Sequence, residues 1–152
     1  MKPNILLVDD DLSVRESLGN LLLQSGYSVI TAADAAEATL CAGPRRFDLV
    51  VLDLSLAFKH GWESIRELAN LTSEAPLIVM TSRSHKHPSA LMSGVSALIE
   101  KPLDPNLLLK HVHDLLMSAG HRHCPVCMGA HAHGSAPKLN LVGAFANAQP
   151  GL

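Results

Sequence analysis

The chain has 152 residues, of which 47% are apolar, and its 12 basic and 14 acidic side chains give a formal net charge of −2. This length can bury a core of its own, and the charge offers no overall basic surplus for nucleic-acid binding. No apolar run reaches the roughly 18 residues of a membrane-spanning helix. Met1–Ile5 leaves no room for a signal peptide, so we expect a cytoplasmic protein. Three cysteines are too few for a disulfide scaffold.

Five short apolar segments recur along the first part of the chain and are predicted to form β-strands. They are Ile5–Val8, Ser28–Thr31, Leu49–Leu52, Leu77–Met80 and Ala97–Ile99. Three of the five are unbroken aliphatic runs, a pattern typical of strands that are buried on both faces of a parallel sheet.

Helical patterns separate the predicted strands. Apolar residues at helical spacing form three stripes, namely Val14, Leu18, Leu21 and Leu22, then Trp62, Ile65 and Ala69, then Leu108, Val112, Leu115 and Leu116. Gly26 follows the first helix at the position where helices commonly end, and Asp104 is placed to cap the last one. Strands that alternate with helices predict right-handed crossovers and a doubly wound α/β sheet.

Polar side chains follow four of the predicted strands at the point where each strand ends. In such a sheet, ligands bind beyond the carboxyl ends of the strands. The residues there are Asp9, Asp10 and Asp11 after the first strand, Asp53 after the third, Thr81 and Ser82 after the fourth, and Glu100, Lys101 and Pro102 after the fifth. Acids, hydroxyls and a lysine should therefore converge on one edge.

The chemistry of this edge is that of phosphoryl transfer. Crowded carboxylates repel one another and need a counter-charge, and hard oxygen ligands at this density suit Mg²⁺. A carboxylate beside the metal can act as a nucleophile toward phosphorus. A lysine ammonium and a hydroxyl can then spread the charge of the phosphoryl oxygens. Asp11 is expected to be a helix cap or a spectator and not part of this chemistry.

The set Asp9-Asp10, Asp53, Thr81 and Lys101-Pro102 resembles the response-regulator receiver family in order, spacing and placement at strand ends. The resemblance covers residues 1 to about 118, and it implies a flavodoxin-like five-stranded parallel sheet with strand order 2-1-3-4-5 and helices on both faces. It also implies Mg²⁺ as cofactor, and a sensor histidine kinase or phosphotransfer protein as partner. No nucleic-acid or membrane partner is expected.

The resemblance implies a role for each residue of the set. Asp53 is the phosphoacceptor, and Asp10 is a direct Mg²⁺ ligand with Asp9 acting mainly through water. The backbone carbonyl of Ser55 is a further ligand of the metal. Thr81, with Ser82 beside it, contacts the phosphoryl group and reports its presence. Lys101 pairs with that group, Pro102 holds a cis bond, and Gly61 matches the glycine that the family places after the acceptor loop.

The sequence departs from the family pattern at three places. Leu98 stands where the family usually has an aromatic switch residue, so the usual route from phosphorylation to output is in question. The segment from Thr81 to Gly94 is short for the family, which predicts a remodelled output face. Ala57 replaces a common proline after the acceptor, and Lys59 and His60 follow it, in a loop that is either simply solvated or able to tune dephosphorylation.

The chain divides by composition into a receiver segment, residues 1–118, and a tail, residues 119–152, that is expected to be disordered. The tail is too short for a usual DNA-binding effector domain. It carries Cys124 and Cys127, with His131 and His133 following, which are zinc-ligand types at local zinc spacing. A redox dithiol and a flexible tail with incidental Cys and His remain open alternatives.

The favoured interpretation is a two-component response regulator that is phosphorylated on Asp53 and acts on an unknown downstream protein by protein–protein contact. A degenerate receiver that serves as a constitutive interaction platform is one alternative. A metal-responsive regulator, controlled through the tail with Zn²⁺, is another. A substrate-processing enzyme is disfavoured, because Ser55 stands where an aspartyl phosphatase would need a second Asp and no phosphate-binding glycine loop is present.

Overall fold

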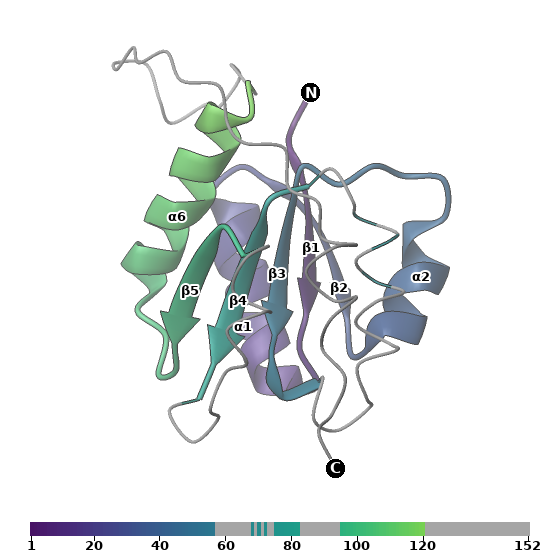
Figure 1. The fold of residues 1–152 in the computed structure, drawn as a ribbon, viewed down its shortest axis with the longest axis horizontal. Coiled ribbons are helices and arrows are strands. Elements are labelled where there is room, and N and C mark those ends of the chain that lie inside the picture. Colours follow the sequence, from purple (N-terminus) through teal and green to yellow (C-terminus); the bar gives the residue numbers. More distant parts are fainter. Residues whose placement is uncertain (57–67, 69, 71, 73–74, 83–94, 121–152) are drawn as a thin grey trace.

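The computed structural model describes residues 1–56, 68, 70, 72, 75–82 and 95–120 (Figure 1). Within these ranges the elements follow the predicted alternation. They are β1 (Asn4–Val8), α1 (Leu12–Gln24), β2 (Ser28–Ala32), α2 (Ala35–Ala42), β3 (Leu49–Asp53), β4 (Leu77–Thr81), β5 (Ala97–Glu100) and α6 (Pro105–Ser118). The predicted Trp62 stripe, Ala57, Lys59, His60, Gly61 and most of the short segment before Gly94 lie outside the described residues, as does the tail from residue 121.

The five strands form one parallel sheet in the order β2-β1-β3-β4-β5, which confirms the predicted doubly wound topology. The register aligns Val8 with Ala32 and with Leu52, and Thr81 with Glu100, so the carboxyl ends of the strands lie along one edge. Each predicted strand is confirmed and is one residue longer than expected. As a result β3 ends on Asp53 itself and β4 on Thr81.

Helices cover both faces of the sheet, because successive side chains of a strand point to opposite faces. Leu7 and Val51 belong to the core cluster beneath α1 and α6, whereas Leu6 and Val50 belong to the cluster beneath α2. Figure 1 shows α1 behind the sheet and α2 beside β2. Strands β3 and β4 are buried along their whole length, as their unbroken aliphatic runs predict.

Two of the three predicted helix stripes, those of α1 and α6, are confirmed together with the predicted helix ends at Asp11, Gly26 and Asp104. Leu18 and Leu22 of α1 are buried, as are Leu108, Val112 and Leu116 of α6. Asp11 caps α1 by accepting hydrogen bonds from the Ser13 and Val14 backbone, and Asp104 caps α6 through the Asn106 N–H. Gly26 takes a φ of 92°, a left-handed conformation that favours glycine just after a helix. In the described residues, no helix has the length and apolarity needed to cross a membrane.

Candidate functional site

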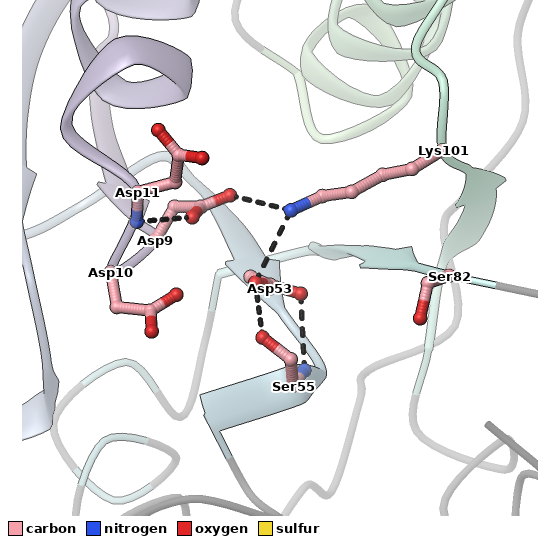
Figure 2. Close-up of a pocket in the computed structure, with 7 residues that line it drawn as sticks. All are labelled: Asp9, Asp10, Asp11, Asp53, Ser55, Ser82 and Lys101. Carbon is pink, nitrogen blue, oxygen red and sulfur yellow. Dashed lines mark hydrogen bonds and ion pairs between the residues drawn. The ribbon is translucent and has the colours of Figure 1, made fainter. Parts of the chain in front are cut away.

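A pocket lies at the carboxyl edge of the sheet, where the sequence predicts a site (Figure 2). Four strand ends build it, because loops that leave β1, β3, β4 and β5 turn away at the same edge. The residues that line it are Asp9, Asp10, Asp11, Asp53, Ser55, Ser82 and Lys101. The structure therefore brings together the predicted acids, the lysine and one of the predicted hydroxyls.

Three of the four carboxylates that line this pocket lie close together. Asp9, Asp10 and Asp53 each offer an oxygen, and these oxygens lie within 4.8 Å of one another. Asp9 is 0% exposed and Asp53 is 3% exposed, whereas Asp10 is not buried. Carboxylate oxygens at this spacing fit a small divalent cation that keeps part of its water shell, so the donor set suits Mg²⁺.

Lys101 supplies the positive charge on the opposite side. Its Nζ lies 2.9 Å from Asp9 Oδ2 and 3.2 Å from Asp53 Oδ2, so one ammonium bridges both buried carboxylates. Burial by itself lowers the pKa of Lys101, but the hydrogen bond to Asp9 and the charges of Asp53 and Asp9 outweigh it and hold that pKa above its usual value. The lysine is thus a firmly held cation.

Opposing effects act on the pKa of Asp9. Burial has the largest effect and raises this pKa above its usual value, and the charge of the neighbouring Asp53 also raises it. Hydrogen bonds from the Asp11 N–H and from Lys101, and the charge of Lys101, lower it in part. Asp9 Oδ1 accepts the Asp11 N–H at 2.9 Å. These contacts fix the direction of the Asp9 carboxylate, which approaches Lys101 in Figure 2.

Asp53 is held at the end of β3 by the residue two positions later. The Ser55 N–H donates to Asp53 Oδ1 at 3.0 Å, and the Ser55 hydroxyl donates a short hydrogen bond to Asp53 Oδ2. Backbone hydrogen bonding continues beyond the strand, because the Leu54 N–H donates to the Met80 carbonyl at 2.8 Å. The resemblance implies only a backbone role for Ser55, and the contact of its hydroxyl with the acceptor was not predicted.

Thr81 ends β4 and Leu98 lies on β5, and neither is among the residues that line the pocket. Thr81 is fully buried, its hydroxyl donates to the Ser82 carbonyl at 3.2 Å, and its own carbonyl accepts the Lys101 N–H at 2.7 Å. Leu98 is half-buried and packs against the core cluster beneath α2. The Lys101–Pro102 peptide is cis, as predicted.

Arg15 is a neighbour of the site that the sequence analysis overlooked. Its Nη1 donates to the Asp9 carbonyl at 2.7 Å, although Arg15 itself is not among the residues that line the pocket. The sequence hint was that Arg15 lies one turn into the first helix, where a side chain can point back toward β1. That direction becomes clear only when the geometry of the β1–α1 turn is known.

Comparison with known proteins gives a consistent result. The response regulator receiver domain model matches residues 5–113. The response regulator MprA of Mycobacterium sp. (strain KMS) is 36% identical over 118 residues, which are 76% of this chain and 51% of that protein. The transcriptional regulatory protein GlrR of Escherichia coli (strain K12) is 31% identical over 115 residues, which are 74% of this chain and 26% of that protein. The chain spans about half of MprA and about a quarter of GlrR.

Solved structures show the same likeness in three dimensions. A CheY-like response regulator receiver domain protein from Methanospirillum hungatei JF-1 superposes with a TM-score of 0.68 at 27% identity, over 81% of this chain and 100% of that one. The chemotaxis protein CheY4 of Vibrio cholerae gives a TM-score of 0.63 at 26% identity, over 76% and 99% of the two chains.

Proposed function

The chain belongs to the response regulator receiver domain family, and we propose that its Asp53 carboxylate accepts a phosphoryl group from a sensor histidine kinase or phosphotransfer protein in a Mg²⁺-dependent reaction. The observation that carries this proposal is the bridge of Lys101 between Asp53 and Asp9, at the edge where the third acid, Asp10, also lies. A nucleophilic carboxylate, a metal-binding acid pair and a fixed cation are the groups that such a transfer requires.

The transfer exchanges one bond to phosphorus for another. An oxygen of Asp53 bonds to the phosphorus while the phosphorus–nitrogen bond of the donor phosphohistidine breaks, and the electron pair of that bond leaves with the imidazole, which keeps or takes up a proton. Lys101 lies 3.2 Å from Asp53 Oδ2 and is placed to pair with phosphoryl oxygens once they arrive. Ser55 orients the acceptor through two donated hydrogen bonds.

Asp10, Asp9 and Asp53 would hold the metal, with the Ser55 carbonyl as a further oxygen ligand. When bound, Mg²⁺ neutralises charge on the transferring phosphoryl oxygens. Asp10 is the only one of the three acids that is not buried, so it is best placed to bind a cation that retains water. Asp9, which already pairs with Lys101, acts through water and through the lysine.

The proposed output is a change in protein–protein contact that starts at Thr81, with Ser82 beside it. Thr81 is buried next to the pocket, and its carbonyl accepts the Lys101 N–H. Movement at the phosphorylated edge would therefore reach β4 and β5 together. We propose a cytoplasmic regulator of this kind, whose receiver segment is residues 1–118 and which does not bind nucleic acid through this segment. The chain spans only 51% of the response regulator MprA and 26% of the transcriptional regulatory protein GlrR, so both relatives carry residues that this match does not cover.

One observation favours a second candidate, a constitutive interaction platform. Leu98, at the position of the family's aromatic switch, already packs against the core beneath α2 and has no polar tip that could change partners. Beryllofluoride, which mimics a bound phosphoryl group, distinguishes the two by amide NMR. Shifts confined to residues that line the pocket support the platform, whereas shifts that extend along β4 and β5 support the switch.

The proposed acceptor chemistry is tested by incubating the chain with Mg²⁺ and acetyl phosphate and recording the intact mass. The wild type is expected to gain one phosphoryl group, and Asp53→Asn is expected to gain none. Ser17→Ala, a change at an exposed position on α1, serves as the matched control and should behave as the wild type. A wild type that gains no mass, or a gain that survives in Asp53→Asn, contradicts the proposal.

A further inference from the structure

Arg15 ties the first turn of α1 back to the end of β1. Its Nη1 donates to the Asp9 carbonyl at 2.7 Å, in a partly buried contact between residues six positions apart. Hydrogen bonds from cationic donors are among the stronger ones in proteins. No role is assigned to Arg15 by the acceptor chemistry, because its guanidinium does not line the pocket.

The N–H, the carboxylate and the carbonyl of Asp9 all take part in hydrogen bonds or ion pairs. Its N–H donates to the Ala32 carbonyl at 3.1 Å, its carboxylate accepts the Asp11 N–H and pairs with Lys101, and its carbonyl accepts from Arg15. The contact with Arg15 restrains the peptide plane between Asp9 and Asp10, since a carbonyl oxygen and the next N–H belong to the same rigid plane. That plane sets the direction in which the Asp10 side chain leaves the backbone.

We infer that Arg15 is a positioning residue, which aims the Asp10 carboxylate at the Mg²⁺ site by holding the Asp9 carbonyl. This inference rests on the proposed function, because it needs the three acids to be a metal site. Without the guanidinium, the Asp9 carbonyl would lose a buried donor, and rotation of the peptide plane toward water would turn Asp10 away from Asp53. Outer partners that orient metal ligands commonly affect metal affinity by about tenfold or more.

The direction in which the Mg²⁺ affinity changes when Arg15 is removed separates a positioning role from a simple effect of its charge. Arg15 is a positive charge close to an acidic site, so removing it would by charge alone strengthen Mg²⁺ binding. Positioning predicts the opposite, a weaker affinity. Arg15→Lys keeps a cationic donor, and because the contact with Asp9 is a single hydrogen bond and not a bidentate one, the lysine can replace most of it.

The experiment measures the Mg²⁺ dissociation constant of the full chain by titration calorimetry for the wild type, Arg15→Ala, Arg15→Lys and Arg45→Ala. Arg45 is the matched control, since it is exposed and precedes β3 at the opposite edge of the sheet. Arg15→Ala is expected to raise the constant about tenfold, and Arg15→Lys to restore it to within about threefold of the wild type. Arg45→Ala should leave it unchanged. Should Arg15→Ala not fold, Arg15→Met, which keeps apolar side-chain bulk but has no donor, is expected to show the same rise.

Melting temperatures recorded in EDTA show whether a variant is merely less stable. An Arg15→Ala chain that melts earlier but binds Mg²⁺ as tightly as the wild type, or more tightly, overturns the inference while leaving the proposed function intact. A wild type that binds no Mg²⁺ overturns the proposed function, and this inference with it. A rise that Arg15→Lys reverses supports the positioning role.

Discussion

Replacing Lys101 with methionine keeps most of the apolar stem of the side chain and removes the cation that bridges Asp9 and Asp53. Asp9 is fully buried and Lys101 is 25% exposed, with Nζ 2.9 Å from Asp9 Oδ2 and 3.2 Å from Asp53 Oδ2. Breaking a buried ion pair on one side costs about 3–5 kcal/mol, because the remaining charge stays buried. Two carboxylates are left here, but Lys101 is partly exposed and Asp9 can take up a proton. We expect a loss of about 2–3 kcal/mol near neutral pH.

The loss should depend on pH in a defined direction. Burial already raises the pKa of Asp9, and the loss of Lys101 removes two influences that lower it. A carboxyl whose pKa is higher in the folded state than in the unfolded state binds more protons when folded, so stability falls as pH rises through the folded pKa. The difference between Lys101→Met and the wild type should therefore be smaller near about pH 5 than near neutral pH.

The assay is urea unfolding at both pH values in EDTA, with Lys110→Met as the matched control. Lys110 pairs with Asp114 at the same 2.9 Å distance, but those side chains are 70% and 53% exposed. Such a surface pair contributes about 0.3–0.5 kcal/mol. The Lys101→Met penalty should also shrink in an Asp9→Asn background, because the buried charge is then absent. Equal penalties for the two lysine variants, or a penalty that grows on acidification, would refute the reasoning.

Three further outcomes follow from the site and the tail. Asp10→Asn should weaken Mg²⁺ binding about tenfold, which titration calorimetry measures. The same change should leave the free energy of unfolding in urea nearly unchanged, because Asp10 is not buried. Beryllofluoride should induce amide shifts along β4 and β5 in Thr81→Ser, which keeps the hydroxyl, but only at the pocket in Thr81→Val. Shifts along β4 and β5 that persist in the valine variant would show that the Thr81 hydroxyl does not transmit the change. Zinc titration of the chain tests the metal-responsive alternative, which requires a site that Cys124→Ser and Cys127→Ser abolish. An affinity no tighter than that of a histidine-rich peptide of equal length would exclude that alternative.

The doubly wound class of the fold could be predicted from local patterns in the sequence. The unbroken aliphatic runs of β3 and β4 are typical of strands buried on both faces, and their alternation with helices favours a parallel sheet. The strand order came from the resemblance to the receiver family and not from these runs. Strand ends were less certain, since Asp53 and Thr81 are polar but buried. Their inclusion in the strands depends on hydrogen bonds to neighbouring strands, which the sequence alone does not reveal.

The site could be predicted as a set of residues but not as a set of contacts. The placement of Asp9, Asp53 and Lys101 at strand ends was enough to bring them together. The bridging geometry of Lys101 and the hydroxyl contact of Ser55 depend on side-chain directions that only the folded chain fixes. Arg15 was missed for the same reason, because its contact is with a backbone carbonyl and not with another motif residue.

The most direct test of the central claim identifies the residue that carries the phosphoryl group. The phosphorylated chain is treated with borohydride, which reduces an aspartyl phosphate to homoserine, and the peptides are then sequenced by mass spectrometry. The account predicts homoserine at position 53, at the end of β3, and only after treatment with both Mg²⁺ and phosphodonor. Homoserine at Asp9 or Asp10, or a phosphoryl group on a histidine or serine with Asp53 unchanged, would contradict it.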